Sequence, residues 1–220
     1  MSFQMTEEQR AATDGLRKLL DVIEPEFLAH GEGFIPREKM SGWMKQLTEF
    51  GLINAPHPEE HGGLGLDWVT HLRLFEEVAY TSMDIAIPIV INIVGADLLI
   101  QGASQHLRDK YLPGLMNGDL FISMGISDGY EVRGIPKMAL NGQSTAQIFL
   151  TDVRVPVENV IGEVGGGLKN TLVTFERARC HMAAWGYSIG RRAMDEAIKY
   201  SQERTQHGKP IAGHQLVAEK

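Results

Sequence analysis

The chain has 220 residues, of which 43% are hydrophobic and 22% charged, and its formal net charge at pH 7 is −7. This is the composition of a folded globular protein, and it excludes the disordered, collagen-like and mucin-like classes. Because the charge is acidic and no basic run exceeds the pair Arg191 and Arg192, the sequence predicts neither a nucleic-acid partner nor binding to an anionic membrane.

The single cysteine and the most apolar segment both indicate a cytoplasmic protein. Cys180 can form neither an internal disulfide nor a thiolate metal site, which suits a reducing compartment. The amino terminus lacks the pattern of a secretory or transit peptide, so we expect a cytoplasmic location of the bacterial type. Residues 85–96 are mostly apolar, but Asp97 ends the run well short of the roughly 18–20 residues that span a bilayer. A buried helix is therefore expected there.

Residues 1–118 are predicted to be helical. Thr6 and Gln9 have the spacing of a capping box, and apolar residues then recur at helical spacing. Pro25 is expected to end or kink this first helix. A second helix is predicted over residues 36–51, with proline at its start and glycine at its stop.

Three more helices are predicted after a loop at residues 55–66, whose prolines and glycines exclude a regular element. Asp67 caps the first of them. Either Ser82 or Asp84 opens the second, which is the apolar helix, and Ser104 opens the third.

Beyond residue 118 the chain changes character. Short β-branched or aromatic runs, separated by glycine and proline, predict strands at residues 120–126, 131–135 and 147–155. So few strands are too little for a stable sheet of their own. This part of the chain is therefore interpreted as a piece of a larger β domain.

From Gly167 the pattern is helical again and runs to Arg204. Gly186 and Gly190 are the expected points for a break in this long helix. A polar loop follows, and a last helix is predicted to begin at Gly213.

No metal site or hydrolytic triad is expected. The eight histidines include no pair with a metal-ligand spacing and a third ligand nearby, so they are interpreted as core or solvated side chains. Ser123 and Ser127 lack the context of a nucleophile elbow. The glycine-rich residues 162–167 precede a helix, but they match no nucleotide fingerprint, and a flexible helix entry is the alternative.

Two charged segments could hold a phosphate-bearing ligand. Glu176, Arg177 and Arg179 lie within the long helix, where Arg179 stands beside apolar residues and needs an anionic partner. Residues 203–208 place a cation and several hydrogen-bond donors at the end of that helix. A solvated helix face is the alternative for the first group.

Five segments together resemble the acyl-CoA dehydrogenases, and they occur in the family's order along nearly the whole chain. They are PEEHGGLGLD at 58–67, FEEV at 75–78, KYLPGL at 110–115 followed by Gly118, VRVP at 153–156 with NVIG at 159–162, and residues 204–215.

The resemblance implies a mainly α fold with a smaller β part. Residues 1–118 would form the N-terminal helical domain, 119–162 a remnant of the middle β domain, and 163–220 the first part of the C-terminal helical domain. It also implies FAD as cofactor, an acyl-CoA thioester as substrate and a homotetramer. The reaction would be α,β-dehydrogenation, with electrons passed to an electron-transferring flavoprotein.

The same resemblance assigns site residues, which fall into three groups. Those expected at the flavin ring are Ile126 and Ser127. Those expected to reach the FAD of a neighbouring subunit are Arg204, Thr205, Gln206, His214 and Gln215. Those expected near the acyl-CoA are Glu176 and Arg179.

Two departures from the family pattern leave the catalytic base unassigned. After Asp128 the chain passes at once to a segment that resembles the end of the middle domain, and the loop that carries the catalytic glutamate in most members is absent. Some members place the base on the long helix, but that position falls on Ala178, about 200° around the helix from Glu176.

The leading hypothesis is therefore a FAD-dependent dehydrogenase of which these residues form a part. A truncated, inactive relative that serves as a binding or assembly subunit is the first alternative. An oxidase or monooxygenase on the same scaffold is the second.

Overall fold

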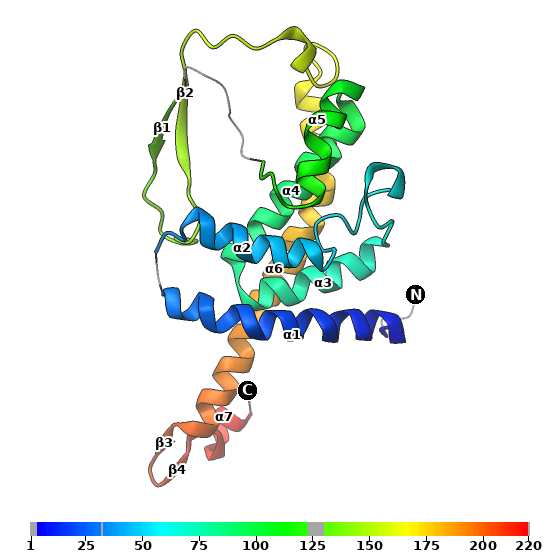
Figure 1. Ribbon diagram of the computed structural model, residues 1–220. Coiled ribbons are helices and arrows are strands. Elements are labelled where there is room, and N and C mark those ends of the chain that lie inside the picture. The colour runs from blue at the N-terminus through cyan, green and yellow to red at the C-terminus, as the bar shows by residue number, and fades with distance from the viewer. Residues whose placement is uncertain (1–3, 32, 123–129, 220) are drawn as a thin grey trace.

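The structure is a computed structural model that describes residues 4–31, 33–122 and 130–219. It is mainly helical with two small antiparallel sheets, which confirms the predicted fold class (Figure 1). The helices are α1 (Glu7–His30), α2 (Arg37–Glu49), α3 (Trp68–Thr81), α4 (Met83–Gly102), α5 (Gln105–Met116), α6 (Gly167–Glu203) and α7 (Gln215–Ala218). The strands are β1 (Tyr130–Gly134), β2 (Ala146–Leu150), β3 (Thr205–Gln206) and β4 (Lys209–Pro210), and short 3-10 turns lie at Glu59–His61, Val157–Asn159 and Ile211–Gly213.

The helix starts follow local capping chemistry, as predicted. Thr6 and Gln9 form the reciprocal capping box of α1, in which each side chain accepts from the other residue's backbone N–H at 3.1 Å. Asp67 accepts from two backbone N–H groups of α3 at 3.0 Å. The cap of α4 is Ser82 rather than the aspartate two residues on, and Ser104 caps α5.

Pro25 does not end α1, which continues to His30. A proline inside a helix removes one backbone donor, a cost that tertiary packing can offset. Here Ile23 is fully buried on one side of the proline, and on the other the ring of Phe27 meets that of Trp43 edge-on at 6.2 Å. The helix stops at Gly31, where φ is +73°.

The core lies among α1, α2, α3 and α4, and a smaller cluster fills the space between α4 and α5. Among the described residues, α4 is the one helix long and apolar enough to cross a membrane by length and composition. Most of it is buried, however, and this includes its polar Asn92 and Asp97. It is therefore a core helix, as the sequence predicted.

The strand predictions hold in part. β1 pairs antiparallel with β2, from Tyr130 opposite Leu150 to Gly134 opposite Ala146, but residues 151–155 are not strand. Nor is the described part of the predicted strand at 120–126. Instead, Asn92 of α4 donates to the Leu120 carbonyl at 3.1 Å and accepts from the Ile122 N–H at 3.0 Å. The backbone groups of this segment therefore form hydrogen bonds to a side chain of α4 instead of to a strand. Residues 123–126 lie outside the described residues.

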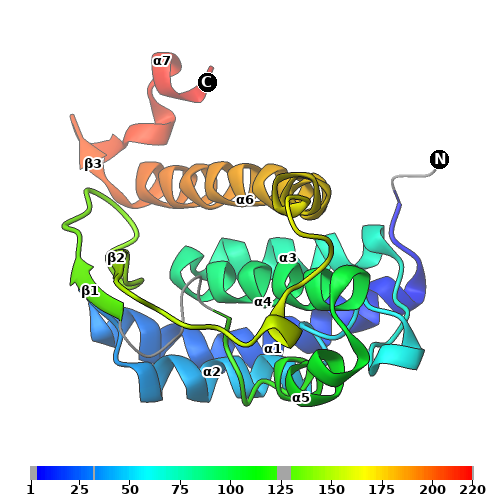
Figure 2. The same ribbon diagram turned by 90° about the horizontal axis from the view of Figure 1, so that it is seen from above.

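The long helix α6 runs for 37 residues without a break at Gly186 or Gly190. Both glycines are exposed, but Ser188 between them is buried and contacts α3, and this packing offsets the low helix propensity of glycine. Figure 2 shows α6 lying across α3 and α4, on the side away from α2 and α5.

Candidate functional site

The face of α6 that packs on the N-terminal helices is polar. Its members recur every three or four residues and form one stripe, here called the α6 seam: Thr174, Arg177, His181, Ala184, Ser188 and Arg191. The apolar residues that define the helix in the sequence lie off this seam and are between 40% and 74% exposed: Leu168, Leu172, Phe175, Met182 and Ile189. The described structure thus leaves the apolar stripe of α6 uncovered.

The first contact of the seam is an ion pair whose carboxylate, Asp97, is buried. Arg177 donates from Nη1 to Oδ1 of Asp97 on α4 at 2.8 Å, and the Asp97 side chain is only 3% exposed. Nδ1 of the fully buried His57 lies 3.3 Å from the same oxygen. The Arg177 guanidinium also lies over the ring of Trp68, 5.2 Å from its centroid. Asp97 of α4 and Trp68 of α3 thus contact Arg177, and His57 lies beside the Asp97 carboxylate.

One turn further along, two buried histidines join α6 to α3. Nε2 of His71 and Nε2 of His181 are 2.8 Å apart, and Nδ1 of His181 is 3.2 Å from the Arg177 carbonyl. Because a carbonyl only accepts, His181 carries its proton on Nδ1. Its Nε2 is then the acceptor, and His71 donates from Nε2. The hydrogen bond therefore requires His181, the acceptor, to be neutral.

The surroundings of the pair keep it neutral. Burial, followed by the proximity of His181, lowers the pKa of His71 to about 3. Burial likewise lowers the pKa of His181 to about 4, although the Arg177 carbonyl opposes that shift. The rings of Trp68 and Phe75 pack edge-on against His181, with centroids 5.6 and 4.9 Å away.

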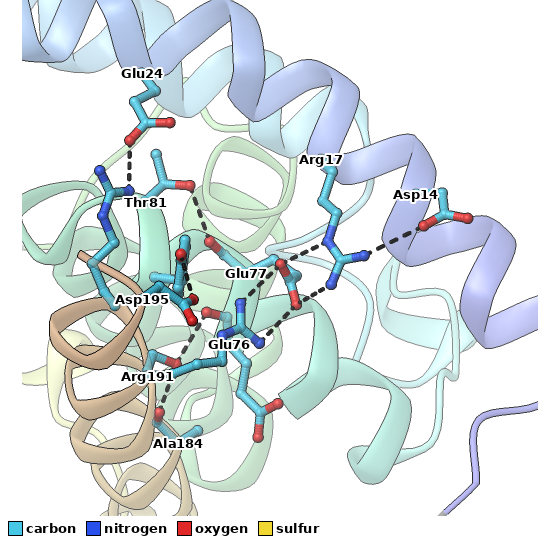
Figure 3. Close-up of polar contacts among 12 residues, drawn as sticks. Asp14, Arg17, Glu24, Glu76, Glu77, Thr81, Ala184, Arg191 and Asp195 are labelled. Carbon is cyan, nitrogen blue, oxygen red and sulfur yellow. Dashed lines mark hydrogen bonds and ion pairs between the residues drawn. The ribbon is translucent and has the colours of Figure 1, made fainter. Parts of the chain in front are cut away.

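At the next contact of the seam, a carboxylate on α3 is held between two arginines (Figure 3). Glu77 accepts two hydrogen bonds from Arg17 of α1, at 2.9 and 3.0 Å, and two from Arg191 of α6, both at 3.2 Å. Burial would raise the pKa of Glu77, but the hydrogen bonds from the two guanidinium groups outweigh it and leave the pKa below its usual value. Glu77 thus ties α1, α3 and α6 together.

Further polar contacts surround this carboxylate. The Tyr80 hydroxyl donates to Asp195 at 2.7 Å, and Arg192 donates to Glu24 at 2.6 Å. A cleft of about 520 Å³ lies among these side chains, between α1, α3 and α6. The charged side chains that line this cleft already pair with one another, so we interpret the cluster as a structural contact that holds α1, α3 and α6 together.

The two residues predicted near the acyl-CoA lie on the opposite face of α6. Glu176 and Arg179 are both exposed, and a spacing of three residues puts them about 60° apart around the helix. In the described chain no carboxylate lies within 4 Å of Arg179, so these residues do not supply the anionic partner expected for it, and its binding of a phosphate-bearing ligand stays a prediction. The guanidinium with that partner is Arg177, whose position faces α4.

The residues predicted to contact FAD meet at the far end of α6. The β3–β4 hairpin brings Arg204, Thr205 and Gln206 back toward α7, where His214 Nε2 lies 3.1 Å from the Gln206 carbonyl and Gln215 follows. Figures 1 and 2 show this tip extending beyond the N-terminal helices. Apart from the half-buried His214, these side chains are exposed.

The tip lies far from the residues predicted near the acyl-CoA. It is separated from Arg179 by 25 residues of helix, which is about 37 Å at about 1.5 Å per residue. Ile126 and Ser127, predicted at the flavin ring, lie outside the described residues.

Sequence reasoning missed the residues that fix α6 in place. The sequence pattern indicated only that Asp97 ends an apolar run, that His57 lies in a loop and that Glu77 belongs to the FEEV motif. It indicated no partner for any of them. The signal that could have found the seam is the recurrence of polar residues at intervals of three and four through α6, in register with its buried positions. In the part of the chain that the structure describes, no group of three or more histidine, cysteine or acidic side chains is arranged to hold a metal ion.

Comparison with known proteins identifies the same family at both ends of the chain. A family model described as "Acyl-CoA dehydrogenase, N-terminal domain" matches residues 6–119, and one described as "Acyl-CoA dehydrogenase, C-terminal domain" matches residues 165–220. The caffeyl-CoA reductase-Etf complex subunit CarC of Acetobacterium woodii is 42% identical over 91% of this chain and 68% of its own length. That alignment runs over 268 positions against 220 residues here, so at least 48 of its positions have no counterpart in this chain.

Solved structures show the same fold. The glutaryl-coenzyme A dehydrogenase in complex with glutaryl-CoA has a TM-score of 0.87 at 21% identity, covering all of this chain and 73% of the other. A glutaryl-CoA dehydrogenase from Mycobacterium smegmatis, in complex with FADH2, has a TM-score of 0.80 at 15% identity, covering 98% of this chain and 70% of the other.

Proposed function

Because the chain belongs to the acyl-CoA dehydrogenase family, we propose that it takes part in the FAD-dependent α,β-dehydrogenation of an acyl-CoA thioester, with electrons passed to an electron-transferring flavoprotein. The observation that carries this proposal is the match of both helical family domains, in order, on one chain. The relative from an Etf complex and the solved complexes with glutaryl-CoA and FADH2 support the electron acceptor, the substrate class and the cofactor. The proposal includes the domain division at residues 118 and 162 and a cytoplasmic location.

The tip of α6 has a donor set that fits the pyrophosphate of FAD. Arg204 is exposed, and within the described ranges no carboxylate lies within 4 Å of it. Thr205, Gln206 and Gln215 add exposed hydroxyl and amide groups beside it. In this role the tip binds and orients the cofactor, and bound FAD supplies the acceptor for the hydride. His214, hydrogen-bonded to the Gln206 carbonyl, holds the donors together.

The position of the tip supports an oligomer. Arg204 lies about 37 Å along α6 from Arg179, so the tip and the proposed substrate residues stand at opposite ends of this helical segment. One site therefore does not use both, and we propose that the tip reaches the cofactor of a neighbouring subunit in a homotetramer. The exposed apolar stripe of α6 gives such an assembly a surface to bury.

In the proposed site, Glu176 and Arg179 act on the substrate side. Both project from the exposed face of α6, where Glu176 offers a hydrogen-bonding carboxylate and Arg179 a cation that no carboxylate of the described residues pairs with. Neither is proposed as the base. We assign no catalytic base among these 220 residues.

A second candidate function is a binding or assembly subunit without activity. The unmatched positions in the alignment with the relative from A. woodii favour it, since residues 120–164 are all that separates the two matched domains. It predicts no bound flavin and a stable complex with a longer family member.

The test is to purify the protein, record its flavin absorbance and follow the reduction of an artificial electron acceptor with straight-chain, glutaryl and aryl acyl-CoA esters. Acyl-CoA-dependent reduction supports the dehydrogenase, whereas oxygen consumption without the acceptor identifies an oxidase or monooxygenase. No flavin and no turnover would refute the redox proposal. Arg204→Gln is expected to lose FAD, while the matched control Arg37→Gln, exposed on α2 far from the tip, retains it.

A further inference from the structure

The ion pair between Asp97 and Arg177 lies on the same turn of α6 as the two proposed substrate residues. Arg177 is the immediate neighbour of Glu176 and stands two positions before Arg179. At about 100° per residue, Glu176 and Arg179 are both on the half of the helix that faces away from Arg177. Whatever fixes the side chain of Arg177 therefore fixes the direction in which the other two project.

Besides the ion pair, the Trp68 ring against Arg177 and the packing of Ala178 on the core hold this turn. The neighbouring buried Thr174 uses its hydroxyl within its own helix, on the carbonyls of Asn170 and Thr171. Among the described residues, the next ion pair that joins α6 to another helix is that of Arg191, about 21 Å further along. His181 supports the Arg177 carbonyl, but the charged contact at this turn is the one with Asp97.

The burial of Asp97 also calls for a role beyond stability. Replacing a buried ion pair with apolar side chains is often neutral or stabilising, because desolvation offsets the attraction between the charges. Asp97 is nevertheless 3% exposed, with Arg177 and His57 as its close charged or polar neighbours. A fixed hydrogen-bonded pair sets an orientation that apolar contacts would leave loose.

We propose that Asp97 is a positioning residue which, through Arg177, sets the rotation of α6 so that Glu176 and Arg179 face the acyl-CoA. This inference rests on the proposed function. A rotation of α6 by 20° moves a side-chain tip at a radius of about 5–6 Å by about 2 Å. Displacements of about 1 Å in an active site can lower turnover by about a hundredfold.

The test compares Asp97→Asn, Arg177→Gln, Arg179→Gln and the double variant Arg177→Gln/Arg179→Gln in the purified holoenzyme. Either change to the ion pair is expected to raise KM for the acyl-CoA about tenfold or more, with FAD still bound. The double variant should lose less than the two single variants combined, because Arg177 acts in part through Arg179. If Asp97→Asn does not fold, Arg177→Gln carries the test, since that side chain is 45% exposed.

A matched control separates positioning from stability. Glu77→Gln removes the ion pair between α3 and α6 and is expected to lower the urea midpoint of unfolding while leaving KM unchanged. If Arg177→Gln keeps the wild-type KM, or if its effect adds fully to that of Arg179→Gln, the inference is wrong while the dehydrogenase stands. If the wild type neither binds nor oxidises any acyl-CoA, the proposed function itself fails and the inference falls with it.

Discussion

Lowering the pH from 7 to 5 is expected to destabilise the fold by about 4 kcal/mol through the buried pair of His71 and His181. In the folded chain their pKa values are about 3 and about 4, so both rings are neutral throughout this range. In the unfolded chain both would titrate near 6.5. The unfolded state therefore binds more protons below pH 6.5, and stability is lost as the pH falls from there toward 4.

The size of this loss in unfolding free energy follows from the difference between pH 5 and the pKa of the histidines in the unfolded chain. That distance is about 1.5 pH units for each ring, at about 1.4 kcal/mol per unit, which gives about 2 kcal/mol for each histidine. Protonating Nε2 of His181 would also place two N–H groups face to face across 2.8 Å, so acid removes the hydrogen bond as well.

The assay is urea unfolding at pH 7 and pH 5, for the wild type, His71→Gln, His181→Gln and the double variant. The change in unfolding free energy between the two pH values is compared, which cancels whatever the substitutions cost at neutral pH. It should be about halved in each single variant and largely abolished in the double variant. The exposed His106→Gln serves as the control and should match the wild type. A double variant with the wild-type pH dependence would refute this reasoning.

Other substitutions test individual contacts, glycines and helix caps of the fold by urea unfolding. Glu77→Gln should cost about 3 kcal/mol, since it removes the buried negative charge that two arginines share; a loss below about half of that would mean the arginines find new partners. Gly63→Ala should cost at least about 2 kcal/mol, because the added Cβ would overlap the His57 carbonyl, and an unchanged midpoint would contradict this packing. Gly42→Ala, in open space on α2, should instead stabilise by about 0.5–1 kcal/mol, and a loss there would show an unseen contact. Thr6→Ala should cost about 1 kcal/mol; no change would mean that α1 frays at this end regardless.

Much of the helical part could be predicted because caps act between residues two or three apart. The spacing from Thr6 to Gln9 and the aspartate and serines before α3, α4 and α5 gave the correct helix starts. Pro25 and the two glycines of α6 were over-weighted, since the packing of buried neighbours in the same helix outweighs the local preference of one residue.

The seam was harder to predict because its partners are far apart in the sequence. Arg177 and Asp97 are 80 residues apart, and His71 and His181 are 110 apart. The hydrophobic pattern of α6 shows that it is a helix, but not which of its faces meets the N-terminal domain. Periodic apolar residues draw attention to the face that stays exposed here.

The candidate site was predictable only where its residues are neighbours in the chain. Arg204, Thr205 and Gln206 come together with His214 because a tight hairpin joins them. Glu176 and Arg179 share a face because they are three residues apart. Their roles toward FAD and acyl-CoA remain predictions that rest on the family.

The polar seam of α6 also determines how its attachment responds to conditions. Exposure of apolar surface raises the heat capacity of unfolding, whereas exposure of polar surface lowers it slightly. Release of α6 would expose the charged and polar side chains of the seam together with Ala184 and Trp185, so it adds less to the heat capacity than the apolar core of α1–α4 contributes. Warming and cooling therefore act chiefly on that core, whereas added salt, which screens partly exposed charges over about 8 Å at physiological ionic strength, loosens the hold on α6.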